Sequence, residues 1–212
     1  MVVNFFGKRG SGKTYTIKNG VISDCRPPVV IIDILGNYDG SEYIQTKEID
    51  QCLREIRNYY LKEINNEQTN PVINLTSYDF NLAADYISAA LWEINGGTLI
   101  LDEVDAIDFS ESPCFEQNVR YGRNHNIDLI TGCRRPAELS KHITAAANKF
   151  YCFNTHEHRD MFYFEEIFGE RAYELMRCPE HSGLFLDYDK KTIGRFYVDS
   201  SGGIHHAGEG PM

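Results

Sequence analysis

Residues 7–14 read GKRGSGKT, and they directly follow the apolar run MVVNFF at residues 1–6. The octapeptide fits the pattern GxxxxGK[ST] at every fixed position, with an apolar strand before it and helical residues after it, as the pattern requires. Glycines let the backbone curl so that successive N–H groups face one centre, which favours phosphate binding. We therefore expect the phosphates of a nucleoside triphosphate to be held by Gly7, Lys8, Arg9, Gly10, Ser11, Gly12, Lys13 and Thr14.

Two side chains of this loop have roles that follow from its chemistry. The Lys13 ammonium would bridge the β- and γ-phosphates, and the Thr14 hydroxyl would ligate Mg²⁺. A second stretch, TLILDEVD at residues 98–105, carries an apolar strand straight into acidic residues. Asp102 would complete the Mg²⁺ site, and Glu103 would polarise a water molecule for attack on the γ-phosphate. The alternative interpretation of this acidic pair is a solvated loop.

The order of the elements predicts the fold class. Apolar runs typical of buried strands alternate with stretches of helical periodicity, which predicts an α/β fold with a mainly parallel central sheet flanked by helices. The expected strands are 1–6, 29–34, 71–75, 98–101, 127–131 and 149–153. The expected helices are 12–18, 47–65, 82–94, 115–124 and 159–176. A β-hairpin is expected over 183–198, a single domain over 1–199, and a loose glycine-rich tail over 200–212.

Composition narrows the class of protein. The chain has 212 residues, of which 42% are hydrophobic and 25% charged, as in an ordinary folded protein. No apolar run approaches the roughly 20 residues of a membrane span, so we expect no membrane insertion. Because the first motif begins at residue 7, we expect no secretory signal, and a cytoplasmic location. The six cysteines are scattered without a CxxC pair, which argues against a zinc site.

Charge is unevenly distributed along the sequence. The formal net charge is −10, yet residues 120–149 hold six basic side chains against two acidic ones, Asp128 and Glu138. Distribution matters more than the total for a nucleic-acid partner, so this balance keeps such a partner open. The basic side chains of the segment are Arg120, Arg123, Arg134, Arg135, Lys141 and Lys149.

Further stretches carry a resemblance to a known family. VVIIDILGNYD at residues 29–39 has an aspartate after an apolar strand, then a glycine and an amide–tyrosine pair. RYGRNHNI at residues 120–127 leads into the next strand, and Arg135-Pro136 follows that strand. Together with the phosphate loop and Asp102-Glu103, these stretches resemble the FtsK/HerA superfamily of DNA-pumping ATPases over roughly residues 1 to 170.

The resemblance implies a P-loop NTPase fold of the additional-strand, catalytic-glutamate type, and Mg²⁺-dependent hydrolysis of ATP. It also implies a homo-oligomeric ring, a hexamer or a pentamer, in which a neighbouring subunit supplies an arginine to the active site. Arg123 is the first candidate for that arginine and Arg120 the second. Arg134 stands where the family commonly has a polar sensor, often glutamine, so its role as a sensor of the γ-phosphate stays open. For Arg120 and Arg135, simple ion pairing with nearby acidic residues is an equal alternative.

A bare ATPase core of this size most resembles the small genome-packaging ATPases of membrane-containing icosahedral phages and archaeal viruses. We therefore expect translocation of double-stranded DNA into a preformed capsid, through non-specific phosphate contacts in a ring pore. The pore loops are candidates only, after Asp105 and near Lys141. A capsid or portal-vertex protein would be a further partner, and the location would be the host cytoplasm or the packaging vertex of the virion.

Three other functions use the same loop. A phage-assembly or secretion ATPase of the zonula-occludens-toxin type is the nearest, although such proteins usually carry a transmembrane segment. A small-molecule kinase would transfer phosphate to an acceptor, but the sequence has no evident lid insertion. An inert nucleotide-binding scaffold would not need Glu103.

Overall fold

A computed structural model describes residues 1–136 and 139–212 of the chain, so Glu138 lies outside the described residues. These residues form two compact units. The first unit comprises Met1 and Asp24–Ile130, and the second comprises Val2–Ser23 and Thr131–Met212. Strand β6 (Ile127–Cys133) begins in the first unit and ends in the second. The predicted phosphate loop belongs to the second unit, whereas the predicted acidic pair belongs to the first.

The first unit is built on parallel strands. β2 pairs with β5 on one side and with β4 on the other, and β3 pairs with β4; all three pairings are parallel. The strand order is β6-β5-β2-β4-β3. Every residue of β2 and β5 is buried, as expected for parallel strands covered on both faces. The bounds are β2 (Val29–Ile32), β3 (Ile44–Thr46), β4 (Val72–Leu75) and β5 (Gly97–Asp102).

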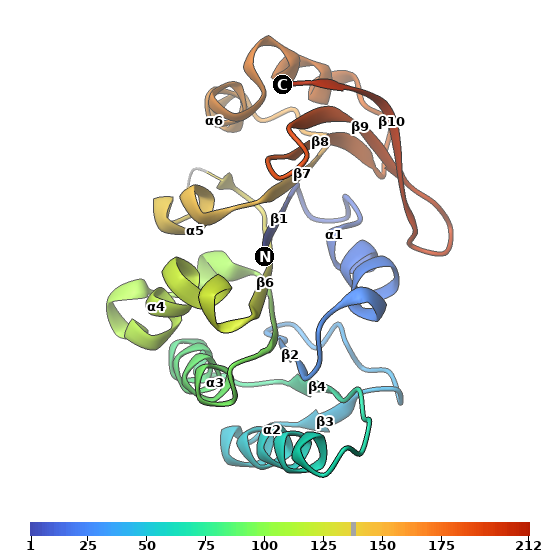
Figure 1. Cartoon of the computed structure of the whole chain (residues 1–212). Coiled ribbons are helices and arrows are strands. Elements are labelled where there is room, and N and C mark those ends of the chain that lie inside the picture. The colour runs from blue at the N-terminus through green and yellow to red at the C-terminus, as the bar shows by residue number, and fades with distance from the viewer. Residues whose placement is uncertain (137–138) are drawn as a thin grey trace. The chain divides into compact units, whose positions relative to one another are not determined.

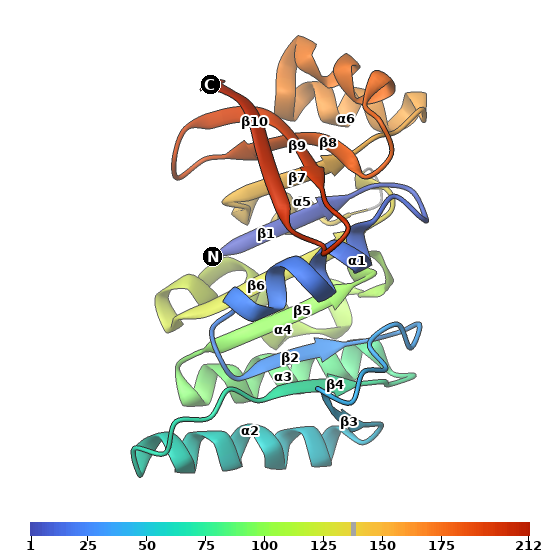
Figure 2. The same ribbon diagram turned by 90° about the vertical axis from the view of Figure 1, so that its right-hand side faces the viewer.

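Three helices lie side by side along these strands (Figures 1 and 2), and they are α2 (Ile49–Ile64), α3 (Phe80–Ile94) and α4 (Pro113–Tyr121). The Asp79 side chain accepts a hydrogen bond from the Leu82 N–H at 3.0 Å and so caps the start of α3. That helix ends at Asn95, which adopts the left-handed conformation that favours helix termination. The helix expected over 82–94 is therefore confirmed as α3.

The second unit combines parallel pairing with an antiparallel ribbon (Figure 1). β1 pairs with β7 in parallel, and β7, β8, β9 and β10 follow one another in antiparallel pairs. The strand order is β10-β9-β8-β7-β1-β6. The bounds are β1 (Val2–Phe6), β7 (Lys149–Phe153), β8 (Ser182–Asp187), β9 (Thr192–Val198) and β10 (Ile204–Pro211).

The helices of the second unit are short. They are α1 (Lys13–Thr16), which a π-helix over Ile17–Val21 continues, then α5 (Lys141–Ala146) and α6 (His158–Phe168), followed by a 3-10 helix over Gly169–Arg177. The sequence predicted the helical segments around α1 and α6 but not α5. Among the residues that the structure describes, no helix is long and apolar enough to span a membrane.

The end of the chain differs from the sequence-based expectation. The hairpin expected over 183–198 is confirmed as β8 and β9, but part of the stretch expected to be a loose tail forms β10 and pairs with β9. Two histidines explain the difference, because His205 stacks on Tyr197 with ring centroids 4.8 Å apart and His206 stacks on Phe185 at 4.1 Å. The prediction of a flexible tail is wrong for these residues, whereas a single domain over 1–199 stays a prediction.

Candidate functional site: a phosphate loop and an acidic strand end

The loop Gly7–Thr14 leaves the carboxyl end of β1 and enters α1. Gly10 and Gly12 have φ angles of 78° and 107°, a conformation that residues with a side chain rarely adopt. Gly7 has no room for a side chain, because a Cβ there would lie 2.5 Å from the Ser11 Oγ and 2.8 Å from the Phe153 Cβ. The shape of the loop therefore requires all three of its glycines, including Gly10 at a variable position of the motif.

Lys13 is folded back across this loop. Its side chain is buried, and its Nζ donates hydrogen bonds to the carbonyl oxygens of Gly7 at 2.6 Å and Lys8 at 3.3 Å. Thr14, next to it, is half-buried. The loop thus holds one ammonium inside its curve, which is the electrostatic requirement for phosphate binding. Lys8 and Arg9 are exposed at the outer side of the loop.

The end of β6 contacts the start of the loop. The Gly7 N–H donates to the carbonyl of Cys133 at 3.2 Å, so the end of β6 meets the start of the loop. Arg134 and Arg135 follow Cys133 directly, and both are exposed. The structure therefore places Arg134, the predicted sensor, at the chain segment that adjoins the loop.

His181 is a neighbour of the loop that the sequence analysis missed. Its Nδ1 lies 3.1 Å from the carbonyl oxygen of Ser11, and 2.9 Å from the position that a Cβ on Gly12 would occupy. No local pattern could have revealed this contact, because 170 residues separate His181 from Ser11.

In the first unit, Asp102 ends β5 and is 4% exposed. The Tyr38 hydroxyl donates to its Oδ2 at 3.3 Å. Asp33 stands at the equivalent position after β2, because Ile32 pairs with Leu101 in the parallel register. Two carboxylates therefore lie at the ends of adjacent parallel strands. The sequence analysis expected this position for Asp102 only.

Glu103 has an unusual backbone conformation, with φ 109° and ψ 49°. The other non-glycine residues of positive φ in the described chain lie between 53° and 59°, inside the ordinary left-handed region. Conformations of this kind cost about 1 to 3 kcal/mol and persist where the surrounding structure imposes them, often at functional sites. The backbone strain at the half-buried Glu103 therefore lowers the free energy of unfolding of the protein.

The two candidate arginines of the first unit differ in their partners. Arg120 forms an i,i+4 ion pair on α4, with its Nη2 at 2.7 Å from the Glu116 Oε1. Arg123 is exposed on the following 3-10 helix over Gly122–His125, and its side chain has no ion pair or hydrogen bond within the described chain. The ion pairing considered for Arg120 is thus confirmed, whereas Arg123 remains available to another molecule.

The predicted Mg²⁺ ligands have the right chemistry. Mg²⁺ prefers one or two carboxylates together with phosphate oxygens, rather than a cage of protein ligands. Thr14 and Asp102 offer hard oxygen donors of this kind. Within the residues that the structure describes, no group of three or more His, Cys, Asp or Glu is arranged to hold a metal ion alone. Each of the two side chains, taken by itself, has the chemistry that suits Mg²⁺ bound with a nucleotide.

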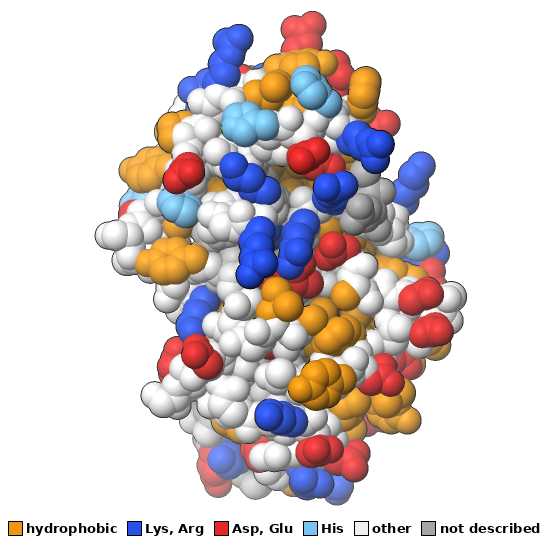
Figure 3. Space-filling model, turned by 180° about the vertical axis from the view of Figure 1, so that it is seen from behind, with side chains coloured by type: hydrophobic (Ala, Val, Ile, Leu, Met, Phe, Trp, Pro, Cys, Tyr) orange, Lys and Arg blue, Asp and Glu red, His pale blue; other side chains and the backbone are white. Residues whose placement is uncertain are grey.

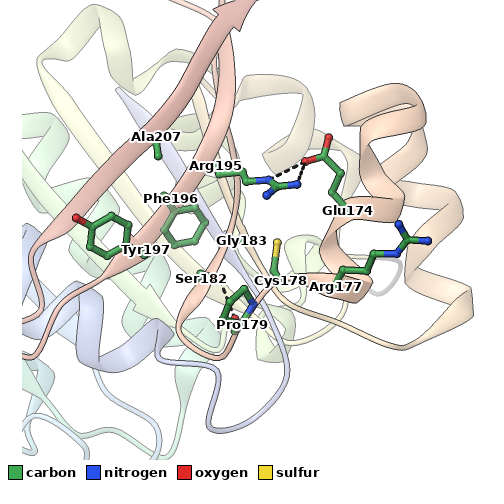
Figure 4. Close-up of a pocket in the computed structure, with 10 residues that line it drawn as sticks. All are labelled: Glu174, Arg177, Cys178, Pro179, Ser182, Gly183, Arg195, Phe196, Tyr197 and Ala207. Atoms are coloured by element: carbon green, nitrogen blue, oxygen red, sulfur yellow. Dashed lines mark hydrogen bonds and ion pairs between the residues drawn. The ribbon is translucent and has the colours of Figure 1, made fainter.

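A pocket of about 280 Å³ opens elsewhere in the second unit (Figure 4). Arg195 points toward Glu174 there, and its Nε and Nη2 each lie 2.8 Å from the Glu174 Oε2. Hydrogen bonding from Arg171, more than from Arg195, lowers the pKa of Glu174. None of the predicted site residues lines this pocket, which is formed by Glu174, Arg177, Cys178, Pro179, Ser182, Gly183, Arg195, Phe196, Tyr197 and Ala207.

The fold is that of P-loop NTPases, as the sequence analysis predicted, with a mainly parallel sheet flanked by helices and a C-terminal hairpin. Solved structures with a similar fold include a packaging protein of Sulfolobus turreted icosahedral viruses. The genome packaging NTPase B204 of Sulfolobus turreted icosahedral virus 2, in complex with AMPPCP, matches with a TM-score of 0.70 at 17% identity, over 92% of this chain and 95% of that chain. The same protein in complex with sulfate gives a TM-score of 0.71 at 16% identity, covering 92% and 94%.

The DNA-packaging ATPase B204 of Sulfolobus turreted icosahedral virus gives a TM-score of 0.67 at 18% identity, over 92% of this chain and 95% of that chain. No protein-family model and no curated protein matches the sequence. At these identities the likeness shows the fold. The predicted resemblance to small genome-packaging ATPases is confirmed at that level.

Proposed function

We propose that this chain is an ATP-hydrolysing translocase of double-stranded DNA that packages a viral genome into a preformed capsid. The observation that carries the proposal is the phosphate loop GKRGSGKT, with its positive-φ glycines, in a fold shared with a genome packaging NTPase. The neighbour B204 was solved in complex with AMPPCP and with ATP-gammaS. They support ATP as the nucleotide of this chain by analogy of fold.

Binding of the nucleotide falls to the second unit. In this proposal the Lys13 ammonium exchanges its hydrogen bonds with the Gly7 and Lys8 carbonyls for the β- and γ-phosphates. Only the ammonium is charged in the present contacts, whereas both partners are charged in a contact with phosphate, so the exchange favours the bound state. Backbone N–H groups of the loop supply the remaining contacts.

Hydrolysis also requires the first unit. Thr14 and Asp102 would hold Mg²⁺, which neutralises charge on the phosphates. Glu103 accepts the proton of the attacking water molecule, and this general-base role contributes typically about 10² to 10⁴-fold in rate. The imposed backbone of Glu103 supports this role, because strain of this kind is characteristic of functional positions.

Completion of the site requires a second copy of the chain. A guanidinium that stabilises charge on the transferred phosphoryl group contributes about 10³ to 10⁵-fold in rate. Arg123 is the better candidate for this role, because it is exposed and unpaired in the described chain, whereas Arg120 is held by Glu116. Arg134 would sense the γ-phosphate from within its own subunit. The assembly would be a hexameric or pentameric ring.

Contact with DNA is assigned in this proposal to the second unit. The candidate loop after Asp105 is acidic, with Asp108 and Glu111 close behind it. The second unit carries exposed cations such as Lys141 and Arg177, and neither is ion-paired within the described chain. One face of the molecule shows several Lys and Arg side chains gathered together (Figure 3). Phosphate contacts from such side chains give grip without sequence specificity.

The setting follows from the activity. A packaging ATPase would act in the host cytoplasm or at the packaging vertex of the virion, where a capsid or portal-vertex protein would dock it. The alternatives are a zonula-occludens-toxin type ATPase and a small-molecule kinase, and a kinase would act without DNA.

The test is ATP hydrolysis by the purified protein with and without linear double-stranded DNA, together with particle images in the presence of an ATP analogue. We expect rings, and turnover that duplex DNA stimulates. The variant E103Q is the matched control and should lose turnover with and without DNA. Turnover indifferent to DNA, or transfer of the γ-phosphate to a small acceptor, would contradict the proposal.

A further inference from the structure

The loop that follows β2 places one buried tyrosine between two carboxylates. Tyr38 is 0% exposed, and it is among the largest fully buried side chains of the described residues. Its backbone N–H donates to the Asp33 Oδ2 at 2.8 Å, and its hydroxyl donates to the Asp102 Oδ2 at 3.3 Å. Asp33 and Asp102 are 1% and 4% exposed. A single residue thus binds the carboxylates at the ends of two adjacent parallel strands.

Further hydrogen bonds fix the backbone of this tyrosine. Its carbonyl oxygen accepts from the Asn74 Nδ2 at 2.7 Å and from the Gln45 Nε2 at 2.7 Å. The two amides also bond to each other, with the Asn74 Nδ2 at 2.9 Å from the Gln45 Oε1. Asn74 belongs to β4 and is buried, so the network is anchored in the sheet. The backbone of Tyr38 is therefore tied to Asp33 at the end of β2, to Asn74 of β4 and to Gln45 of β3.

The Tyr38 phenol is the donor in its contact with Asp102. A neutral phenol has one O–H, and here its acceptor is Asp102. The phenol sets the orientation of the carboxylate that accepts its hydrogen bond.

We infer that Tyr38 is a positioning residue for Asp102, holding one carboxylate oxygen so that the group presents a fixed geometry to Mg²⁺. The inference rests on the proposed function, in which Asp102 is a metal ligand. Hydrogen bonds to ligating carboxylates orient them, and losing such a partner typically costs about 10 to 100-fold in metal affinity or activity. The amide–tyrosine pair Asn37-Tyr38 noted in the sequence would owe its tyrosine to this contact.

The test is the Mg²⁺ dependence of nucleotide binding, measured with a fluorescent ATP analogue at increasing Mg²⁺ and in EDTA. The variant Y38F removes only the hydroxyl. We expect the Mg²⁺ concentration for half-maximal binding to rise about 10 to 100-fold, with binding in EDTA unchanged. The matched control is Y43F, which removes a hydroxyl from the other tyrosine of the loop, whose ring lies 6.2 Å from that of Tyr38. It should behave as wild type.

Two further variants separate the possible failures. If D102N leaves the Mg²⁺ dependence unchanged, the proposed role of Asp102 is wrong, and the inference falls with it. If D102N raises the Mg²⁺ requirement while Y38F matches Y43F, the inference alone is overturned. Should Y38F fail to fold, Q45A replaces it, because Gln45 is exposed yet bonds to the Tyr38 carbonyl. A smaller rise in the same direction is then expected, and no rise contradicts the inference.

Discussion

The two units of the molecule differ sharply in charge. The first unit has 7 Lys and Arg against 19 Asp and Glu, a net charge of −12, whereas the second has 14 against 12, a net charge of +2. The phosphate loop belongs to the positive unit, and Asp102 and Glu103 belong to the negative one. The net charge of −10 is therefore the sum of two opposite balances. In the proposed function, one unit binds the phosphates and the other supplies the carboxylates for hydrolysis.

The largest expected effect concerns the arginines, one from each unit. R123A should lower turnover by about 10³-fold or more, because the developing charge on the phosphoryl group loses its guanidinium. If the arginine acts on a neighbouring subunit, mixing R123A with wild type should depress activity below simple dilution. R134A, in the second unit, should show simple dilution, because we propose that it acts within its own subunit. Steady-state hydrolysis over a series of mixing ratios measures both.

The control for this prediction is R120A. Arg120 is exposed and paired with Glu116, and ion pairs of this kind contribute only about 0.3 to 0.5 kcal/mol. We expect turnover close to that of wild type. If R120A rather than R123A depresses the activity of mixtures below simple dilution, Arg120 is the arginine that acts on the neighbouring subunit.

The next effect concerns DNA and compares the units directly. The double variant K141E/R177E reverses two exposed cations of the second unit, and R54E/R57E reverses two exposed cations on α2 of the first. The affinity of the first variant for duplex DNA should fall about tenfold or more. The slope of the logarithm of affinity against the logarithm of salt concentration should become less steep by about 0.9 per lost phosphate contact. Fluorescence anisotropy over a range of salt concentrations measures this. Equal losses in the two variants would refute the assignment of DNA to the second unit.

Local patterns predicted most of this arrangement. The phosphate loop and the acidic end of β5 are continuous stretches whose spacing carries their chemistry, so both were found from the sequence. Contacts between distant segments were not. The bond from Tyr38 to Asp102 depends on β2 lying beside β5, and the bond between His181 and Ser11 depends on β8. β10 was missed because its glycine-rich sequence has weak strand propensity, which stacking on Tyr197 and Phe185 overrides.

The smallest effect concerns the stability of the first unit. E103G should relieve the imposed backbone at φ 109°. Strain of about 1 to 3 kcal/mol, less the entropy that glycine adds to the unfolded chain, leaves a gain of about 1 kcal/mol. We expect thermal unfolding to shift upward by about 2 to 4 °C, although hydrolysis is lost. E103Q keeps the strain and should unfold within about 1 °C of wild type, so a lower unfolding temperature for E103G would contradict this account.

Single-turnover hydrolysis of radiolabelled ATP tests the division of tasks most directly, because one sample reports both the bound fraction and the rate. K13A, in the second unit, should weaken binding by about 100-fold, since it removes a charge-assisted bond of about 3 kcal/mol. E103Q, in the first unit, should bind ATP as wild type does and hydrolyse it about 10² to 10⁴-fold more slowly. Wild-type hydrolysis of bound ATP by E103Q, or wild-type affinity in K13A, would contradict the account.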